Sequence, residues 1–196
     1  MLFRGNTGHR LRKQNDGPYV LSLASQEIKR LSFESLSFRE RDDYYLIEAS
    51  NHYGRTEIKI QKDAKSDLEY EIRHVMYPMP AMDGGSSANL ELFVSYQSGL
   101  KNLRKFKTDS NGLTMIERVY GHEGKYNEIP FNIETNIYPV NRIITTKDES
   151  SLQELTVAVD RPQGATVLPS SEILIHLNRA TFTDDEKGMG EVTYEN

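Results

Sequence analysis

The five histidines are the first side chains to consider for chemistry, because imidazole binds zinc and transfers protons near neutral pH. They are His9, His52, His74, His122 and His176. No two of them stand three or four residues apart, the spacing that places two metal ligands on one helical face. The chain also has no cysteine, which excludes thiolate metal sites and disulfides. The sequence therefore predicts no metal site within the chain, and His176, flanked by apolar residues, fits the edge of a core.

Carboxylates are the second source of chemistry. Glycosidases need two carboxyl groups that face each other about 5–10 Å apart, but 29 acidic residues make chance pairs common. The densest acidic stretch is Asp184-Asp185-Glu186, whose oxygens suit a cation. Because Lys187 follows and no EF-hand spacing is present, a solvated turn fits this stretch better. The chain has neither a G-x-S-x-G elbow nor a P-loop.

The overall charge narrows the choice of partners. A net charge of −5 and a pI near 5.6 argue against nucleic-acid and membrane-surface binding, which reward a basic face. No apolar run is long enough to span a bilayer, and residues 1–8 do not resemble a signal peptide. We therefore expect no nucleic acid and no membrane among the partners.

The elements that would position these side chains are predicted to be strands. Apolar and polar residues alternate in the segments 44–49, 56–61, 69–77, 90–96, 155–159 and 173–177. Ser25 to Phe38 fits neither the helical nor the strand period and is left unassigned. Short strands with frequent turn signals predict an all-β fold, a large antiparallel sandwich with few helices. Pro, Gly and Ser cluster near 79–89, which fits either a weak domain boundary or a loop within one sandwich spanning 1–196.

Four short phrases follow one another in the second half of the chain. They are TDSNG at 108–112, ETNIYPVN at 134–141, DRPQG at 160–164, and Asn178-Arg179 followed by DDEKGMG at 184–190. In this order they resemble the C-terminal β-region of glycoside hydrolase family 38, the class II and lysosomal-type α-mannosidases. The resemblance extends over residues 106–190.

The individual residues of these phrases also have ordinary structural explanations. Asn111-Gly112 favours a tight hairpin turn with Gly112 at positive φ. Tyr138, held extended by Pro139, fits a packed residue at a strand end. Asp160 and Arg161 fit an ion pair at a strand end, and we interpret that segment as architectural.

The resemblance implies a β-domain of the galactose-mutarotase-like supersandwich kind. In the family, zinc and an aspartate nucleophile lie in an N-terminal barrel, and the enzyme hydrolyses α-mannosidic bonds of glycans with retention. This sequence has no His-x-Asp pair and no tryptophan, so we expect the chain alone to be non-catalytic, with zinc ligands outside it. The expected partners are a mannose-containing glycan and a catalytic barrel or other chains of the enzyme. The expected compartment is the lysosomal or secretory lumen for a fragment of the enzyme, and the cytoplasm for a stand-alone chain.

Two residues are the candidates for contacting substrate. Arg179 matches the first of two family arginines that reach the sugar, although Ala180 replaces the second. Tyr19 lies in a G-P-Y phrase that resembles the family's SGAY phrase, with Pro18 in place of alanine. A strand-end arginine and a buried strand tyrosine are the structural alternatives. A stand-alone carbohydrate-binding or interaction module, with Tyr44, Tyr45 or Tyr96 as an aromatic platform, is the alternative function.

Overall fold

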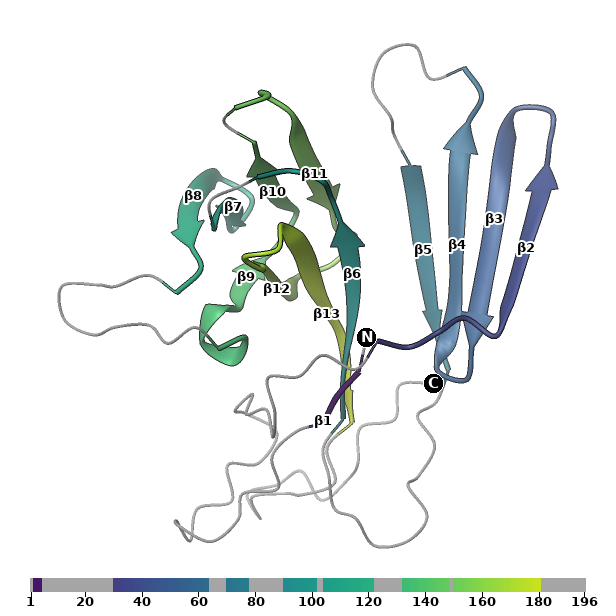
Figure 1. Ribbon diagram of the computed structural model, residues 1–196, viewed down its shortest axis with the longest axis horizontal. Coiled ribbons are helices and arrows are strands. Elements are labelled where there is room, and N and C mark those ends of the chain that lie inside the picture. The colour runs from purple at the N-terminus through teal and green to yellow at the C-terminus, as the bar shows by residue number, and fades with distance from the viewer. Residues whose placement is uncertain are drawn as a thin grey trace, which may run out of the picture. The chain divides into compact units, whose positions relative to one another are not determined.

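The computed structural model describes residues 2–4, 30–63, 70–77, 90–101, 104–121, 132–148 and 150–180, and these residues form β-strands (Figure 1). The strands are β1 (Leu2–Arg4), β2 (Ser35–Glu40), β3 (Tyr44–Asn51), β4 (Gly54–Gln61), β5 (Tyr70–Met76), β6 (Leu90–Gln97), β7 (Lys105–Ser110), β8 (Thr114–Val119), β9 (Tyr138–Val140), β10 (Ile143–Lys147), β11 (Glu154–Ala158), β12 (Gln163–Val167) and β13 (Glu172–Ala180). Over these ranges the helical structure consists of one 3-10 turn, Glu134–Asn136. The prediction of an all-β protein is confirmed.

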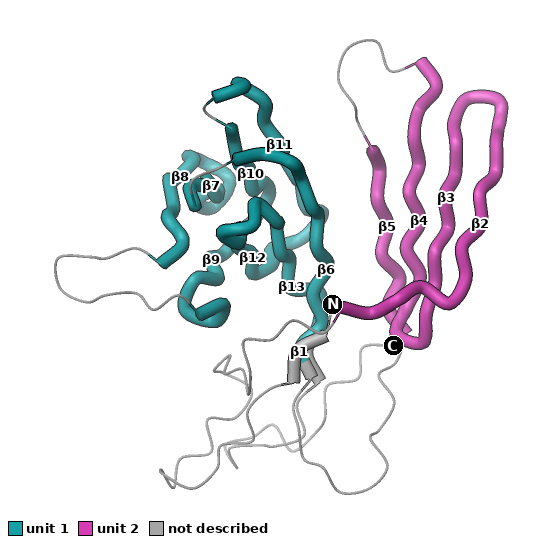
Figure 2. The backbone as a smooth tube through the Cα atoms, in the orientation of Figure 1, with its two compact units in different colours: residues 1–29, 87–192 teal, residues 30–86, 193–196 magenta. Residues whose placement is uncertain are grey.

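The chain divides into two compact units (Figure 2). Unit 1 comprises Met1–Lys29 and Ser87–Val192, and unit 2 comprises Arg30–Ser86 and Thr193–Asn196. The Pro, Gly and Ser cluster at 79–89 lies outside the described residues.

Unit 1 contains two antiparallel sheets that share one core. One sheet has the order β1-β6-β13-β12-β9, and the other has the order β11-β10-β7-β8. Both sheets contribute to the buried apolar cluster, for example Phe93 and Ile173 from the first and Phe106 and Ile144 from the second. Strands that bury side chains from two facing sheets form a β-sandwich. Strand β13 is buried on both faces over Ile173, Leu174 and Ile175, which explains why its sequence is a nearly continuous apolar run.

Unit 2 contains a single four-stranded antiparallel meander, in the order β2-β3-β4-β5. Strands β3 and β4 are joined through His52 and Tyr53, and the Asn51 side chain accepts a hydrogen bond from the Tyr53 amide at 2.9 Å. This is the local side-chain bond that makes asparagine a good turn residue.

Each of the six predicted strand segments corresponds to a strand of the structure, although Tyr77 and Val159 lie just beyond the ends of β5 and β11 and residue 69 is outside the described residues. Two differences have physical causes. The unassigned stretch Ser25–Phe38 ends in strand β2, whose pairing with β3 from Ser35 to Glu40 is a long-range contact that no local pattern announces. Tyr138 begins strand β9 rather than ending a strand. Because β9 is the edge of its sheet, Pro139 can occupy it without breaking a ladder between two neighbours.

The hairpin between β7 and β8 has the geometry that its sequence predicted. Asn111 has φ of 52° and Gly112 has φ of 70°, and the Leu113 amide donates to the Ser110 carbonyl at 3.0 Å. An added Cβ at Gly112 would also lie 3.2 Å from Nε of Arg142. Glycine is therefore favoured here by backbone conformation and by a close neighbour.

We expect Gly112→Ala to lower the free energy of unfolding by about 1 kcal/mol or more, because alanine is strained at positive φ. Urea denaturation followed by circular dichroism measures this. Gly99→Ala is the matched control, since a Cβ there meets no atom within 4 Å. Equal midpoints for the two variants would show that the Gly112 conformation carries no penalty.

Candidate functional site

The first three phrases singled out in the sequence, and Asn178-Arg179 of the fourth, become neighbours in the fold of unit 1, whereas residues 184–190 lie outside the described residues. The first closes the β7–β8 hairpin, and the second leads through β9 into the turn before β10. The third enters β12, where Gly164 pairs with Pro139 of the second phrase. The fourth begins in β13, which pairs with β12. Residues spread over about seventy positions therefore form one continuous framework.

The Asp109 carboxylate joins the first two phrases. Oδ1 accepts hydrogen bonds from the amides of Asn141, Arg142 and Ile143 at 3.0, 2.9 and 3.0 Å. Oδ2 accepts one from the Gly112 amide at 2.7 Å. The side chain is only 4% exposed, so these four amides replace the water that a carboxylate normally binds. The sequence predicted the turn at Asn111-Gly112 but none of the bonds to residues 141–143.

The electrostatics of this side chain follow from those contacts. Desolvation on burial raises the pKa of Asp109, but the amides of Arg142, Ile143, Gly112 and Asn141 outweigh it and lower the pKa from 3.8 to about 2. Amide donors stabilise the charged form of a carboxylate, and several together shift its pKa strongly. Asp109 is therefore ionised throughout the range in which most proteins are folded, and its role is to hold two loops together.

Asp148 repeats this arrangement at another loop. Oδ1 accepts hydrogen bonds from the Ser150 hydroxyl and amide at 2.5 and 2.8 Å, and Oδ2 accepts one from the Lys101 amide at 3.1 Å. The Ser150 hydroxyl, then the backbone donors, hold the pKa of Asp148 well below its ordinary value despite desolvation. The two buried aspartates thus use the same device to fix loops of unit 1.

The remaining contacts within the phrases are also structural. The buried Asn136 accepts a hydrogen bond from the Gly121 amide and donates one to the Asn132 carbonyl, each at 2.7 Å. An added Cβ at Gly164 would lie 2.8 Å from Cγ2 of Ile137, so the third phrase needs a glycine where the second packs against it.

Tyr138 of the second phrase and Arg161 of the third also make contacts of a structural kind. Tyr138 packs edge-on against Phe106, with the Arg118 guanidinium 4.5 Å from its ring centre. Arg161 lies 3.4 Å from Asp160, and both side chains are exposed, so their ion pair contributes little to stability. These contacts agree with the architectural interpretation of both phrases.

A pair formed by a buried glutamate and a partly exposed histidine lies beside the fourth phrase. Nε2 of His176 is 2.7 Å from Oε2 of Glu91, and Glu91 is only 2% exposed. The His176 ring also packs on Phe93, with ring centres 4.8 Å apart. The prediction that His176 lies at the edge of the core is confirmed. Sequence reasoning missed Glu91, and the available signal was a lone charge in the otherwise apolar start of β6.

Arg179 lies in β13 directly after a register shift between His176 and Asn178. Its backbone is paired opposite Glu91 of β6, which is also opposite Phe3 of β1. Strands β1 and β13 therefore flank β6, which places residues from both ends of the chain in one sheet. Tyr19 and Asp184-Asp185-Glu186 lie outside the described residues, so the proximity of Tyr19 to Arg179 stays a prediction.

No group of three or more metal-ligating side chains occurs in the described part of the chain. His176 lies in unit 1, whereas His52 and His74 lie in unit 2, and His9 and His122 are not among the described residues. The described residues therefore offer no set of side chains that fits the zinc ion implied by the resemblance. The described helical structure is too short to cross a membrane.

We expect Asp109→Ala to lower the free energy of unfolding by about 3 kcal/mol or more at pH 7, because it leaves four amides without their charged acceptor. Asp109→Asn should cost less, about 1–3 kcal/mol, since an amide keeps the acceptor for residues 141–143 but not for Gly112. Asp160→Ala, an exposed carboxylate, is the control and should change stability by less than about 0.5 kcal/mol.

The same variants carry a pH signature. Because the folded-state pKa of Asp109 is depressed to about 2, its contribution is present above about pH 3.8 and is lost as pH falls toward 2. The stability gap between the natural chain and Asp109→Asn should therefore narrow over that window in acid titrations. A gap that stays constant from pH 5 to pH 2 would contradict the assigned role of the charge.

Comparisons with known proteins support one relationship. No protein-family profile matches the chain. Among curated proteins, an α-mannosidase of Canavalia ensiformis is 34% identical over 122 residues, covering 62% of this chain and 12% of that protein. An α-mannosidase of Arabidopsis thaliana is 33% identical over 138 residues, covering 70% and 13%. The lysosomal α-mannosidase of Homo sapiens is 30% identical over 128 residues, covering 64% and 12%.

The chain thus spans about an eighth of the length of the curated relatives that it matches. Each alignment covers only that part of the relative, and all three of these relatives are α-mannosidases. The resemblance predicted from the four phrases is confirmed: the chain is related to a region of the α-mannosidases.

Proposed function

We propose that this chain is the non-catalytic C-terminal β-domain of a glycoside hydrolase family 38 α-mannosidase. The observation that carries the proposal is the framework in which Asp109 and the β9–β12–β13 ladder hold together the first three phrases and Asn178-Arg179 of the fourth. A framework of this kind fixes the carboxyl-terminal half of β13, where the candidate Arg179 lies, relative to the rest of the sandwich. The sequence similarity to several α-mannosidases supports the same role.

In the proposed enzyme, a zinc ion and a nucleophile in a separate barrel supply the chemistry of retaining α-mannoside hydrolysis. This chain supplies one wall of the substrate pocket, with Arg179 and Tyr19 as the residues that contact the mannose-containing glycan. Its direct protein partner is the catalytic barrel, in the same polypeptide or in another chain of the enzyme.

We place the protein in the lysosomal or secretory lumen, because its relatives include lysosomal α-mannosidases of Felis catus, Bos taurus and Homo sapiens. The comparisons give no support to the cytoplasmic alternative. The depressed pKa values of Asp109 and Asp148 are compatible with an acidic compartment, since both carboxylates keep their charge at mildly acidic pH.

A stand-alone carbohydrate-binding module is the alternative function, and it needs exposed aromatic rings. The three tyrosines proposed for that role are partly buried. Lys59 lies 4.7 Å from the ring centre of Tyr44, and Lys62 lies 5.0 Å from that of Tyr45. Burial raises the pKa of Tyr96 to about 12. The lysine contacts occupy the rings of Tyr44 and Tyr45, and Tyr96 is removed from solvent by burial, so all three observations favour the α-mannosidase role.

The purified chain should not hydrolyse an aryl α-mannoside above the background of a mock preparation, since the chemistry is assigned to the barrel. A chimera tests the positive part of the proposal. In it, this chain replaces the similar stretch of the Canavalia ensiformis α-mannosidase. We expect hydrolysis of the same substrate to be retained. A well-folded chimera without activity would contradict the proposed function.

Within the active chimera, Arg179→Ala should reduce kcat/KM at least about tenfold without changing the melting temperature, which corresponds to the loss of one charged contact. Arg161→Ala, which removes an exposed arginine elsewhere in the same sandwich, is the matched control and should leave kcat/KM unchanged. Equal activity of the two variants would remove Arg179 from the site.

A further inference from the structure

The sheet of unit 2 has two chemically different faces. Paired residues of antiparallel strands point to the same side of a sheet, and neighbours along a strand point to opposite sides. The register therefore places a mainly apolar set of side chains, called the apolar face, on one side: Leu36, Phe38, Glu40, Tyr45, Ile47, Ala49, Thr56, Ile58, Ile60, Tyr70, Ile72 and His74. The other side, the charged face, carries mainly charged and hydroxyl side chains: Ser35, Ser37, Arg39, Tyr44, Leu46, Glu48, Ser50, Arg55, Glu57, Lys59, Gln61, Glu71, Arg73 and Val75.

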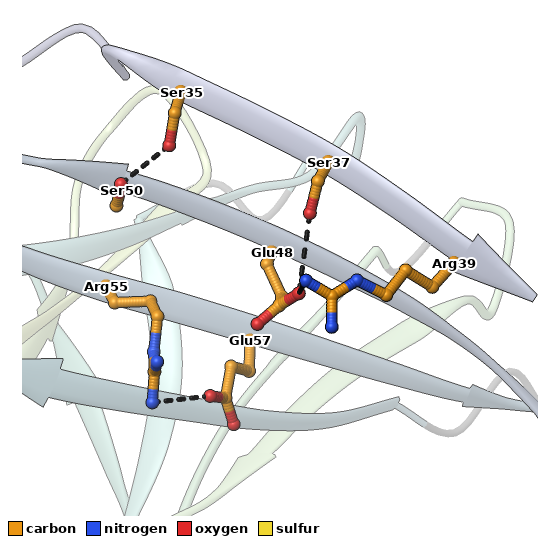
Figure 3. Close-up of polar contacts among 7 residues, drawn as sticks. All are labelled: Ser35, Ser37, Arg39, Glu48, Ser50, Arg55 and Glu57. Carbon is orange, nitrogen blue, oxygen red and sulfur yellow. Dashed lines mark hydrogen bonds and ion pairs between the residues drawn. The ribbon is translucent and has the colours of Figure 1, made fainter.

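The charged face has its own partners within the sheet (Figure 3). Arg39 pairs with Glu48 at 3.1 Å, and Arg55 pairs with Glu57 at 2.8 Å. The Ser35 and Ser50 hydroxyls lie 2.7 Å apart. A surface whose charged side chains are paired across neighbouring strands is well solvated by water, so this face does not need a second layer of protein against it.

The apolar face is open where it should be covered. Leu36 is 73% exposed and Phe38 is 63% exposed, and Tyr70, on the opposite edge strand, is 45% exposed. The buried apolar cluster of the chain draws its described members from unit 1. Burying a leucine or phenylalanine fully is worth about 1.5–3 kcal/mol each, so an exposed face of this composition favours association.

The size of the face indicates what can cover it. Strands of six to eight residues, spaced about 4.8 Å apart, give a face of roughly 20 by 25 Å, or about 500 Å². Two such faces bury about 1,000 Å², the lower limit for a specific protein interface. An association through this face alone is therefore expected to be weak and concentration-dependent.

A second copy of the chain meets the chemical requirements of that face. Among the strand residues on this side, the acidic one is Glu40, which lies at the rim and is 2.7 Å from Lys62. The other titratable ring system there besides the tyrosines is His74, whose Nδ1 lies 2.9 Å from the Thr56 hydroxyl, so two copies bring no unpaired like charges together. Two identical twisted sheets pack face to face at about 10 Å, and a two-fold axis makes the contact self-complementary.

We propose that two copies of this chain associate through the apolar faces of their β2–β5 sheets into a weak two-fold dimer. This inference goes beyond the α-mannosidase role and does not depend on it. The dimer would be a four-on-four stranded sandwich that gives unit 2 the second layer its sequence pattern requires.

Sedimentation velocity of the full chain from about 1 to 500 µM tests the proposal, a range chosen for an interface at the lower size limit. We expect the average mass to rise from monomer to dimer across it. Leu36→Asp should keep the chain monomeric, raising the dissociation constant of the dimer at least about tenfold, because it places a charge in the apolar face. Ser35→Asp introduces the same carboxylate at the adjacent residue, on the charged face, and should leave the dimer intact.

Both substitutions lie at exposed positions of an edge strand, so we expect each variant to fold. Circular dichroism of each variant checks this. A monomer at every concentration would overturn the proposal. Equal weakening by both variants would also overturn it, since that result indicates edge-to-edge pairing of β2. Dimerisation unaffected by Leu36→Asp would place the contact elsewhere.

A second measurement distinguishes a face that is covered by a second copy from one that is already covered within the same chain. Because the chain has no cysteine, Leu36→Cys carries a single environment-sensitive fluorophore, and Ser35→Cys is its control. The Leu36→Cys label should shift to shorter emission wavelength as concentration rises, whereas the Ser35→Cys label should not. A Leu36→Cys label that is already shielded at the lowest concentration would show that another part of the same chain covers the face, and would overturn the dimer.

Discussion

The architecture of unit 1 depends on one buried carboxylate. Asp109 accepts hydrogen bonds from the amides of residues 112, 141, 142 and 143 and so ties the β7–β8 hairpin to the turn between β9 and β10. A buried charge is stable only when its hydrogen-bonding capacity is filled. Loss of either turn would leave the charge without some of its donors, and loss of the charge would leave four amides without an acceptor. The two turns and the aspartate therefore form and break together.

The rest of the framework continues from that junction. Strand β9 carries the second phrase alongside β12, and close packing of Ile137 requires a glycine at position 164. Strand β12 then pairs with β13, the strand that holds Arg179. Substrate contact at the end of β13 would therefore rest on packing that begins more than thirty residues away along the chain.

The two units solve the problem of covering a sheet differently. In unit 1, two sheets bury their apolar faces against each other, and the strands in the middle are buried on both sides. In unit 2, a single sheet separates its chemistry into an apolar and a charged face, and only the charged face is complete. The two-residue alternation of apolar and polar residues is compatible with both arrangements. It determines which face of the sheet a side chain lies on, but it does not determine whether a second sheet packs against that face.

The sequence by itself determined the local structure. Alternation predicted the strands, and Asn111-Gly112 predicted a turn with positive φ, because both depend on the geometry of a few consecutive residues. The order of the four phrases likewise identified the relationship to the α-mannosidases. Only the tertiary structure decided that β2 is a strand, that Asp109 binds three amides of a distant turn, and that Glu91 pairs with His176 across 85 positions. These contacts join segments whose proximity is set by sheet pairing, and sheet pairing leaves no periodic trace in either segment alone.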